Sequence, residues 1–100
     1  MPAFVVIFDD DDLSVAISEP VSNAHVAHFL ALGERAILGG AMLNDEGTAK
    51  ARLLVGEFAS VEEARAFAAT EPLVVAGRVK GWRVEPFFIA QERGVHTPSA

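Results

Sequence analysis

The hydrophobic positions form short continuous runs that alternate with a stretch at helical spacing. The first run, residues 3–8, is rich in β-branched and aromatic residues, and four aspartates at 9–12 follow it. A run of this kind predicts a strand that is buried on both faces. From Pro20 to about Arg35 the apolar residues recur at helical spacing, which predicts a helix that ends near Gly33.

The middle of the chain has the pattern of a hairpin between two strands. Residues 36–43 and 51–58 are apolar runs, and the polar segment 44–48 between them contains a glycine that accepts a positive φ. The paired glycines Gly39 and Gly40 predict a bulge in the first of these strands or a close approach to its backbone.

A second helix is predicted after residue 60. Ser60 and Glu63 match a capping box, in which the hydroxyl and the carboxylate bond each other's backbone amides. The helix is expected to end before Pro72, because a proline disfavours the helical conformation of the residue before it. Residues 73–76 are expected to add one more turn, closed by Gly77.

The order of the predicted elements defines the fold class. A last strand at 82–89 completes the order strand, helix, strand, strand, helix, strand, and residues 91–100 are expected to be a tail. This order predicts an α+β, ferredoxin-like βαββαβ fold with a four-stranded antiparallel sheet and both helices on one face. We expect residues 1–100 to form one domain, because a chain of 100 residues has room for one core.

The predicted strands carry apolar side chains on both faces. In the first strand Val5 and Ile7 alternate with Phe4, Val6 and Phe8. Two helices cover only one face of a sheet, so the other face is expected to meet a second sheet. The 51% hydrophobic content agrees, because so small a chain leaves apolar surface in water when it folds alone. We therefore expect a homodimer that associates through the sheet faces.

Charge and cysteine content exclude several functions. The net charge of −6 argues against nucleic acid and against anionic membrane surfaces as partners. The sequence contains no cysteine, which removes disulfides, thiol catalysis and thiolate metal sites. The first strand passes directly into aspartates, unlike a signal peptide, and no apolar run approaches the ~20 residues of a membrane span. We therefore expect a cytoplasmic protein.

The histidines of the first predicted helix are the first candidate site. His25 lies on the same helical face as Val21, Phe29 and Leu32, which directs its imidazole toward an apolar layer. It is either a general acid or base, since histidine titrates near neutrality, or a core-edge side chain bonded to a carbonyl. His28 lies at the edge of the same face. The two histidines lack a third ligand, so we expect no metal site and no cofactor.

Four other features have alternative interpretations. Glu71 precedes a proline between two helical segments, where a carboxylate either orients an imidazole or caps a helix. The aspartates 9–12 lack the ligand spacing of a calcium loop and are expected to be a solvated acidic connection. Gly39 and Gly40 do not form a phosphate loop, because no Lys-Ser/Thr follows them. Single arginines and lysines are mostly surface charges, but three are candidates for an anionic substrate group: Arg52, Arg78 and Lys80.

From residue 4 to residue 88 the chain resembles the YCII-related (YciI-like) family of the dimeric α/β barrel superfamily. The resemblance lies in the order and spacing of five segments: His-Val-Ala-His-Phe at 25–29, Leu-Gly-Gly-Ala at 38–41, Phe-Ala-Ser-Val-Glu-Glu-Ala at 58–64, Glu-Pro-Leu-Val-Val-Ala-Gly at 71–77 and Val-Glu-Pro-Phe at 84–87.

The resemblance implies a sheet-to-sheet dimer, a pocket near the first helix and a histidine–carboxylate pair. His25 corresponds to the family histidine, and Glu71 stands where members usually carry the aspartate of an Asp-Pro-Tyr/Phe motif. A family member that eliminates halide from a chlorinated ring product uses such a His-Asp pair. The sequence departs from the family pattern at four positions: Glu71 in place of aspartate, Leu73 in place of the aromatic residue, Ser22 in place of arginine and Ala41 in place of proline.

Two functional hypotheses follow. In the first, His25 transfers a proton on a small oxygenated substrate, as in a lyase or isomerase, and Glu71 holds its tautomer. His28, Gly40 and Arg52 would then bind the substrate. In the second, the departures from the family pattern mark a non-catalytic dimeric domain that binds a small molecule or acts as an accessory.

Overall fold

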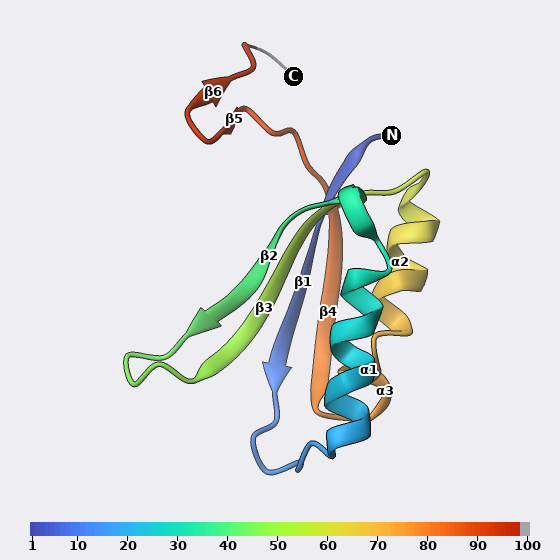
Figure 1. Ribbon diagram of the computed structural model, residues 1–100, viewed down its shortest axis with the longest axis vertical. Coiled ribbons are helices and arrows are strands. Elements are labelled where there is room, and N and C mark those ends of the chain that lie inside the picture. The colour runs from blue at the N-terminus through green and yellow to red at the C-terminus, as the bar shows by residue number, and fades with distance from the viewer. Residues whose placement is uncertain (99–100) are drawn as a thin grey trace.

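A four-stranded antiparallel sheet carries the helices on one face (Figure 1). The computed structural model describes residues 1–98. The strand order is β2-β3-β1-β4, which is the predicted βαββαβ arrangement. In chain order the elements are β1 (Ala3–Asp11), α1 (Glu19–Leu30), the 3-10 helix η1 (Gly33–Arg35), β2 (Ala36–Leu43), β3 (Ala49–Glu57), α2 (Val61–Ala69), α3 (Pro72–Val75), β4 (Val79–Pro86), β5 (Gln91–Glu92) and β6 (Val95–His96).

The first and last strands of the sheet differ from the prediction. β1 continues to Asp11, so the prediction of a solvated acidic connection over 9–12 is wrong for its first part. The side chain of Asp11 is buried against two arginines, which compensate its charge. β4 begins at Val79, three residues earlier than predicted, because the positive φ of Gly77 ends the preceding turn and returns the chain to the sheet.

The first helix is shorter than predicted. Ser18 caps α1 by accepting a hydrogen bond from the Val21 amide, and the helix ends at Leu30. Gly33 then takes a φ of +57°, which a right-handed helix does not allow, and a 3-10 turn leads into β2.

Only half of the predicted capping box forms at α2. The Ser60 hydroxyl accepts a hydrogen bond from the Glu63 amide at 3.1 Å, as expected. The Glu63 carboxylate instead pairs with Arg35, whose Nε also donates to the Glu57 carbonyl at 3.0 Å. The guanidinium of η1 thus takes the carboxylate away from the backbone and ties η1 to the start of α2.

The hairpin between β2 and β3 forms as predicted, but its bulges lie elsewhere. Gly39 and Gly40 pair regularly with Leu54 and Leu53. The register shifts instead at the two ends of β2, between 36 and 38 and between 42 and 43. The glycine pair therefore does not kink the strand; it leaves one stretch of β2 without side chains.

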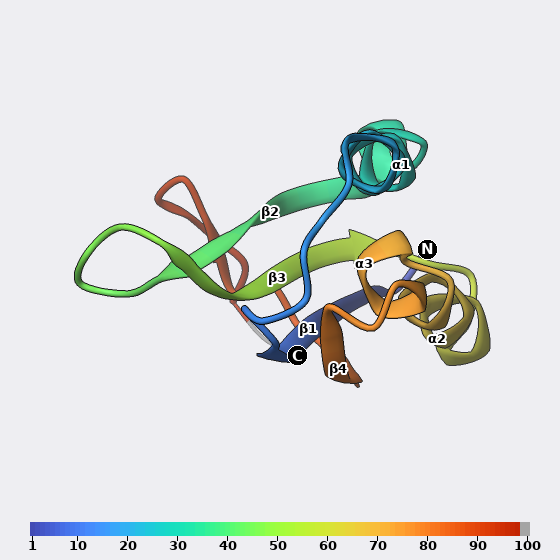
Figure 2. The same cartoon turned by 90° about the horizontal axis from the view of Figure 1, so that it is seen from below.

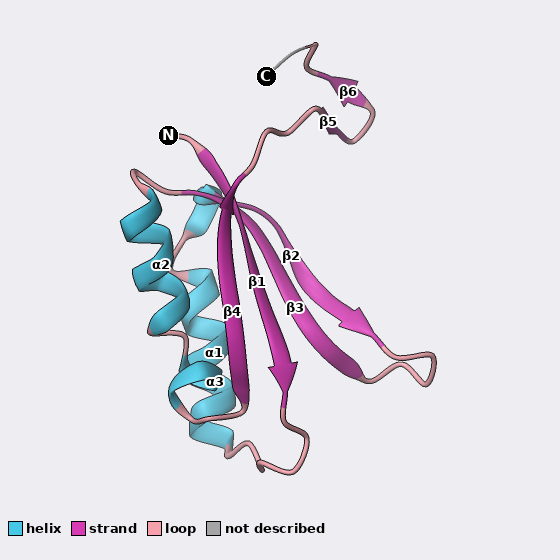
Figure 3. Ribbon diagram, turned by 180° about the vertical axis from the view of Figure 1, so that it is seen from behind, coloured by secondary structure: helices cyan, strands magenta, loops and turns pink. Residues whose placement is uncertain are grey.

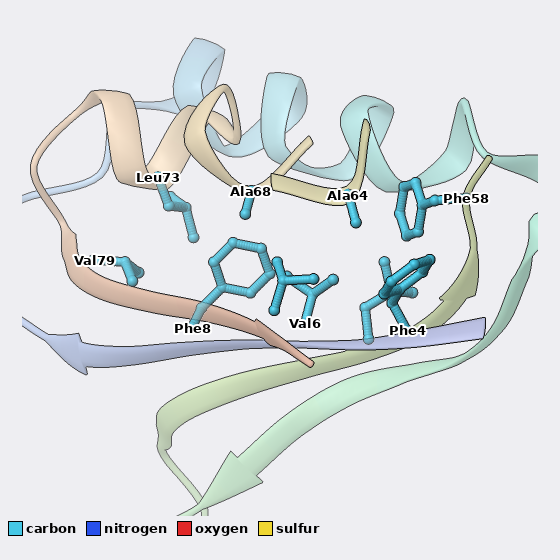
Figure 4. Close-up of a cluster of buried hydrophobic side chains, with 10 residues drawn as sticks. Phe4, Val6, Phe8, Phe58, Ala64, Ala68, Leu73 and Val79 are labelled. Atoms are coloured by element: carbon cyan, nitrogen blue, oxygen red, sulfur yellow. The ribbon is translucent and has the colours of Figure 1, made fainter. Parts of the chain in front are cut away.

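The core lies between the sheet and α2 (Figure 4). Phe4, Val6 and Phe8 point from β1 toward the helices, and Ala64 and Ala68 let α2 approach the sheet closely. The two alanines are four residues apart, so they lie on the same face of the helix. The same cluster is completed by Leu54, Phe58, Leu73, Val79 and Val84.

The two long helices differ in their relation to the sheet. Seen from below, α2 and α3 lie over β1 and β4, whereas α1 stands farther out on the side of β2 and β3 (Figure 2). No residue of α1 is fully buried. This offset leaves room between α1 and the sheet.

The face away from the helices carries apolar side chains from β1, β2 and β3 and the charged Arg83 and Glu85 from β4. Val5 pairs with Val55 and Ile7 with Leu53, and Leu38 of β2 lies opposite Val55. Cross-strand partners share a face, and these residues alternate with the buried ones of β1. All three helices lie on the other side of the sheet (Figure 3). Leu38 is 65% exposed as a result.

The end of the chain extends from the sheet as a small hairpin. β5 and β6 pair with each other and stand beyond the sheet (Figure 1). Arg93 and Gly94 form the turn with positive φ values. The predicted tail over 91–100 is thus a two-stranded hairpin in its described part, and residues 99–100 lie outside the described residues.

The turn after β1 provides a test of local electrostatics. The hydroxyl and the backbone amide of Ser14 donate to the Asp12 carboxylate and hold the pKa of that carboxyl below its ordinary value. In Ser14→Ala the hydroxyl bond is lost, so the pKa of Asp12 is expected to rise. A carboxyl carbon-13 titration of both proteins measures this, and an unchanged pKa would show that the hydroxyl does not bind the carboxylate in solution.

Candidate functional site

A pocket of about 470 Å³ lies between α1 and the strands β2 and β3. It occupies the room that the outward position of α1 leaves. One wall comes from α1 and the other from the two strands. Gly39 of β2 has no side chain to fill the space at the second wall. The lining of the pocket includes His25, Phe29, Gly40, Arg52 and Leu54.

His25 and Glu71 form a pair at the α1 side of this pocket. Nδ1 of His25 lies 2.8 Å from Oε1 of Glu71, although the residues are 46 positions apart. His25 is half-buried, with 22% of its side chain exposed, and Glu71 is fully buried. The helix α1 positions the imidazole, and the turn between α2 and α3 positions the carboxylate.

Glu71 has both of the roles that the sequence left open. Its backbone is extended before Pro72, and its Oε1 accepts a hydrogen bond from the Leu73 amide at 3.2 Å, which caps α3. The same oxygen meets His25. The other oxygen, Oε2, is buried without a hydrogen-bond partner among the described residues. A buried carboxylate is costly without partners, so the bond to His25 matters for the folded state.

The geometry assigns the tautomer of His25. Oε1 already accepts from the Leu73 amide, and a carboxylate has no proton to give, so Nδ1 of His25 is the donor in the neutral ring. Nε2 then carries the free lone pair and makes no hydrogen bond to the described residues. Phe29 packs edge-on against the ring at a centroid distance of 5.1 Å. The ring is therefore held on two sides with one nitrogen left available.

His28 occupies a different environment. Its Nε2 lies 2.8 Å from the Phe67 carbonyl oxygen, and its ring stacks on Phe67 at 4.2 Å. It fastens α1 to α2 and is not among the residues that line the pocket. The sequence prediction grouped it with the substrate-binding residues because it shares a helical face with His25. Three residues along a helix turn the direction of a side chain by about 60°, and His28 points to the neighbouring helix.

The other two predicted substrate-binding residues lie at the pocket. Gly40 lines the pocket with its backbone, because it pairs with Leu53 and a Cβ atom there would point to the open face of the sheet. Arg52 of β3 lies opposite Phe8 of β1 and Ala41 of β2 in the register. Its side chain is 15% exposed and 3.4 Å from the Asp11 carboxylate. Asp11 is the polar residue near the pocket that sequence reasoning missed.

Within residues 1–98, no three histidine, aspartate or glutamate side chains gather as a metal site would require. In the same part of the chain, the helices are all too short or too polar to cross a membrane.

Comparison with known proteins supports the fold. No protein-family model matches the sequence, and no curated protein matches it. Among solved structures the chain is similar to 5-chloro-2-hydroxyhydroquinone dehydrochlorinase of Burkholderia phenoliruptrix AC1100, determined in complex with 2,5-dihydroxybenzoquinone. The TM-score is 0.73 at 23% identity, covering 86% of this chain and 93% of that one. The Arabidopsis thaliana protein At3g17210 is more distant, with a TM-score of 0.45 at 14% identity over 91% of this chain and 98% of that one.

The likeness to the dehydrochlorinase establishes the architecture. It confirms the α+β, ferredoxin-like fold class. At 23% identity it carries no residue-level information about activity. The function must be argued from the pocket itself.

Proposed function

We propose that this protein is an acid–base enzyme that transfers a proton on a small oxygenated substrate in the pocket beside α1. The observation that carries the proposal is the 2.8 Å bond between His25 Nδ1 and a fully buried Glu71 carboxylate at the pocket wall. An imidazole oriented in this way is the usual general base at neutral pH. The similarity to a dehydrochlorinase of the same fold, which acts on a hydroquinone, is consistent with a lyase or isomerase.

In the proposed reaction His25 moves the proton and Glu71 holds the ring. Nε2 takes a proton from an acidic C–H or O–H group, and the electron pair of the broken bond stays on the substrate as an enolate. The bond to Glu71 stabilises the imidazolium that forms. In an isomerisation, the imidazolium returns the proton to another substrate atom. In an elimination, the electron pair expels a leaving group and His25 releases its proton to water.

Glu71 supports this role despite being one methylene longer than the aspartate of the YCII-related family. In the structure the longer side chain reaches His25, with Oε1 of Glu71 2.8 Å from Nδ1 of the ring. The order of the motifs and the shared fold together support placing the chain in the YCII-related family. Leu73, which stands at the family's aromatic position, points into the core and not into the pocket.

The direct test is proton exchange by the wild-type protein. The protein is incubated in deuterium oxide with cyclic 1,3-diketones and hydroxylated quinones, and mass spectrometry measures deuterium incorporation or loss of a leaving group. The proposal expects saturable exchange above the rate in buffer with at least one compound. Compounds that raise the melting temperature without any exchange would contradict it and identify a non-catalytic binding domain.

We also propose that two copies associate through the open face of the sheet. Among the apolar side chains of β1, β2 and β3 on this face, Leu38 of the edge strand β2 is 65% exposed. An exposed apolar patch with charged side chains at its edge is typical of an interface between copies.

The dimer is expected to dissociate in Leu38→Lys. A lysine in an apolar sheet-to-sheet contact buries a charge without a partner, so light scattering after size exclusion is expected to show the mass of a monomer. Val75→Lys, which places a lysine at an equally exposed apolar position on the helical side, is the control and is expected to remain dimeric. A Leu38→Lys protein with the mass of a dimer would show that the interface lies elsewhere.

A further inference from the structure

Two arginines share one buried carboxylate next to the pocket. Asp11 is 2% exposed in its side chain, and its Oδ1 lies 3.1 Å from Nε of Arg78 and 3.4 Å from Nη1 of Arg52. Arg78 is fixed further, because its Nη1 donates to the Val15 carbonyl at 2.8 Å. One carboxylate thus faces two guanidinium groups.

Arg52 is the less satisfied member of this cluster. Its Nη1 is buried, yet it makes no hydrogen bond to the described residues, because the 3.4 Å approach to Asp11 is long for one. A guanidinium has five N–H donors, so most of those on Arg52 remain to be used. Arg52 lines the same pocket as His25, from the opposite, strand side.

We infer that the pocket selects a small organic anion, whose negative oxygen accepts hydrogen bonds from Arg52, and that Asp11 is the positioning residue for Arg52. This inference rests on the proposed function only in that His25 acts on the same ligand. Asp11 holds one edge of the guanidinium by its charge. Because the carboxylate is shared with Arg78, it does not cancel the charge of both arginines.

The chemistry of the substrate follows from this arrangement. A carboxylate or an enolate oxygen matches the guanidinium, which binds planar anions through paired hydrogen bonds. An anion held at Arg52 places the rest of a small molecule across the pocket toward Nε2 of His25. The protein as a whole carries a net charge of −6. The guanidinium of Arg52 therefore places a positive charge at the pocket of a negatively charged protein.

The test compares an acid with its neutral amide. Salicylate and salicylamide are titrated into the full-length protein, and amide shifts of the pocket residues in nitrogen-15 NMR spectra give both dissociation constants. Wild type is expected to bind salicylate about tenfold more tightly, the value of one charge-assisted hydrogen bond beyond a neutral one. Arg52→Gln is expected to remove the preference by weakening salicylate alone. Arg65→Gln, an exposed arginine of α2, is the matched control and is expected to keep the preference.

The role of Asp11 is tested by the same ratio of affinities for salicylate and salicylamide. Asp11→Asn is expected to reduce the acid-over-amide ratio and leave the affinity for salicylamide unchanged, which a general loss of structure would not do. Since loss of a buried carboxylate often impairs folding, a second measurement uses the wild-type protein. The Nε–Hε group of Arg52 is expected to show a rigid heteronuclear NOE in the ligand-free protein, unlike that of exposed Arg65.

Two results would overturn the inference, and both are distinct from failure of the proposed function. Equal affinity of wild type for acid and amide overturns the anion site, and an Arg52 side chain as mobile as that of Arg65 overturns the role of Asp11. A protein that prefers the acid but shows no proton exchange therefore retains the anion site and loses only the enzymatic proposal.

Discussion

His25→Ala is expected to lower the rate of proton exchange by about 10²- to 10⁴-fold, the range that a positioned general acid or base contributes. Nε2 of His25 makes no hydrogen bond to the described residues, and His25 lines the pocket, so the variant removes the proposed base. The measurement is the exchange assay at saturating substrate. His96→Ala is the matched control, because His96 is an exposed histidine on the terminal hairpin.

The same variant is expected to fold with a lower free energy of unfolding, because the buried Glu71 carboxylate keeps only its bond to the Leu73 amide. His25 is half-buried on a helix, where alanine is well tolerated, and no residue of α1 belongs to the buried part of the core. Circular dichroism and thermal unfolding therefore accompany the assay. Exchange at the wild-type rate would show that another group moves the proton, and a variant that fails to fold would show that the imidazole is a structural element.

Phe8→Ala is expected to lower the free energy of unfolding by about 3–5 kcal/mol, the usual cost of removing a buried phenylalanine. Phe8 is fully buried in the middle of β1. Its ring also meets Phe29 of α1 edge-on at 6.0 Å, and Phe29 in turn packs against His25. Loss of Phe8 therefore removes core volume and the support beneath α1.

Urea unfolding of Phe8→Ala and Phe88→Ala measures this effect. Phe88 is an exposed phenylalanine beyond the end of β4, so its replacement is expected to change the free energy of unfolding by less than about 0.5 kcal/mol. Similar losses in both variants would mean that the core is not centred on β1. A loss at Phe8 alone agrees with the packing in Figure 4.

Much of the architecture was predictable because local signals and global fold agree. The helical spacing of apolar residues located α1, and the capping signal at Ser60 located α2. The polar turn before Ala49 marked the hairpin. The sequence singled out both members of the His25–Glu71 pair. The proline after Glu71 predicts an extended backbone at that residue, and the apolar residues around His25 recur at helical spacing. The sequence did not set the distance between the two members of the pair, which depends on how α1 and α3 pack.

The failures of prediction concern contacts between distant segments. Four consecutive aspartates are typical of a solvated loop, and only the folded chain brings Arg52 and Arg78 to Asp11 and makes a strand of that segment. Glu63 leaves the capping box for Arg35 for the same reason. In each case a charge found a partner far along the chain, and a local pattern does not contain that information.

The most direct test of the central claim is the tautomer of the His25 ring. Nitrogen-15 NMR of the ring at high pH, where the imidazole is neutral, distinguishes a proton on Nδ1 from one on Nε2. With Glu71 holding Nδ1–H, wild type is expected to show the proton on Nδ1, and Glu71→Gln is expected to lose this preference. A wild-type ring with its proton on Nε2 would contradict the account, because the nitrogen assigned to proton transfer would then have no lone pair to offer.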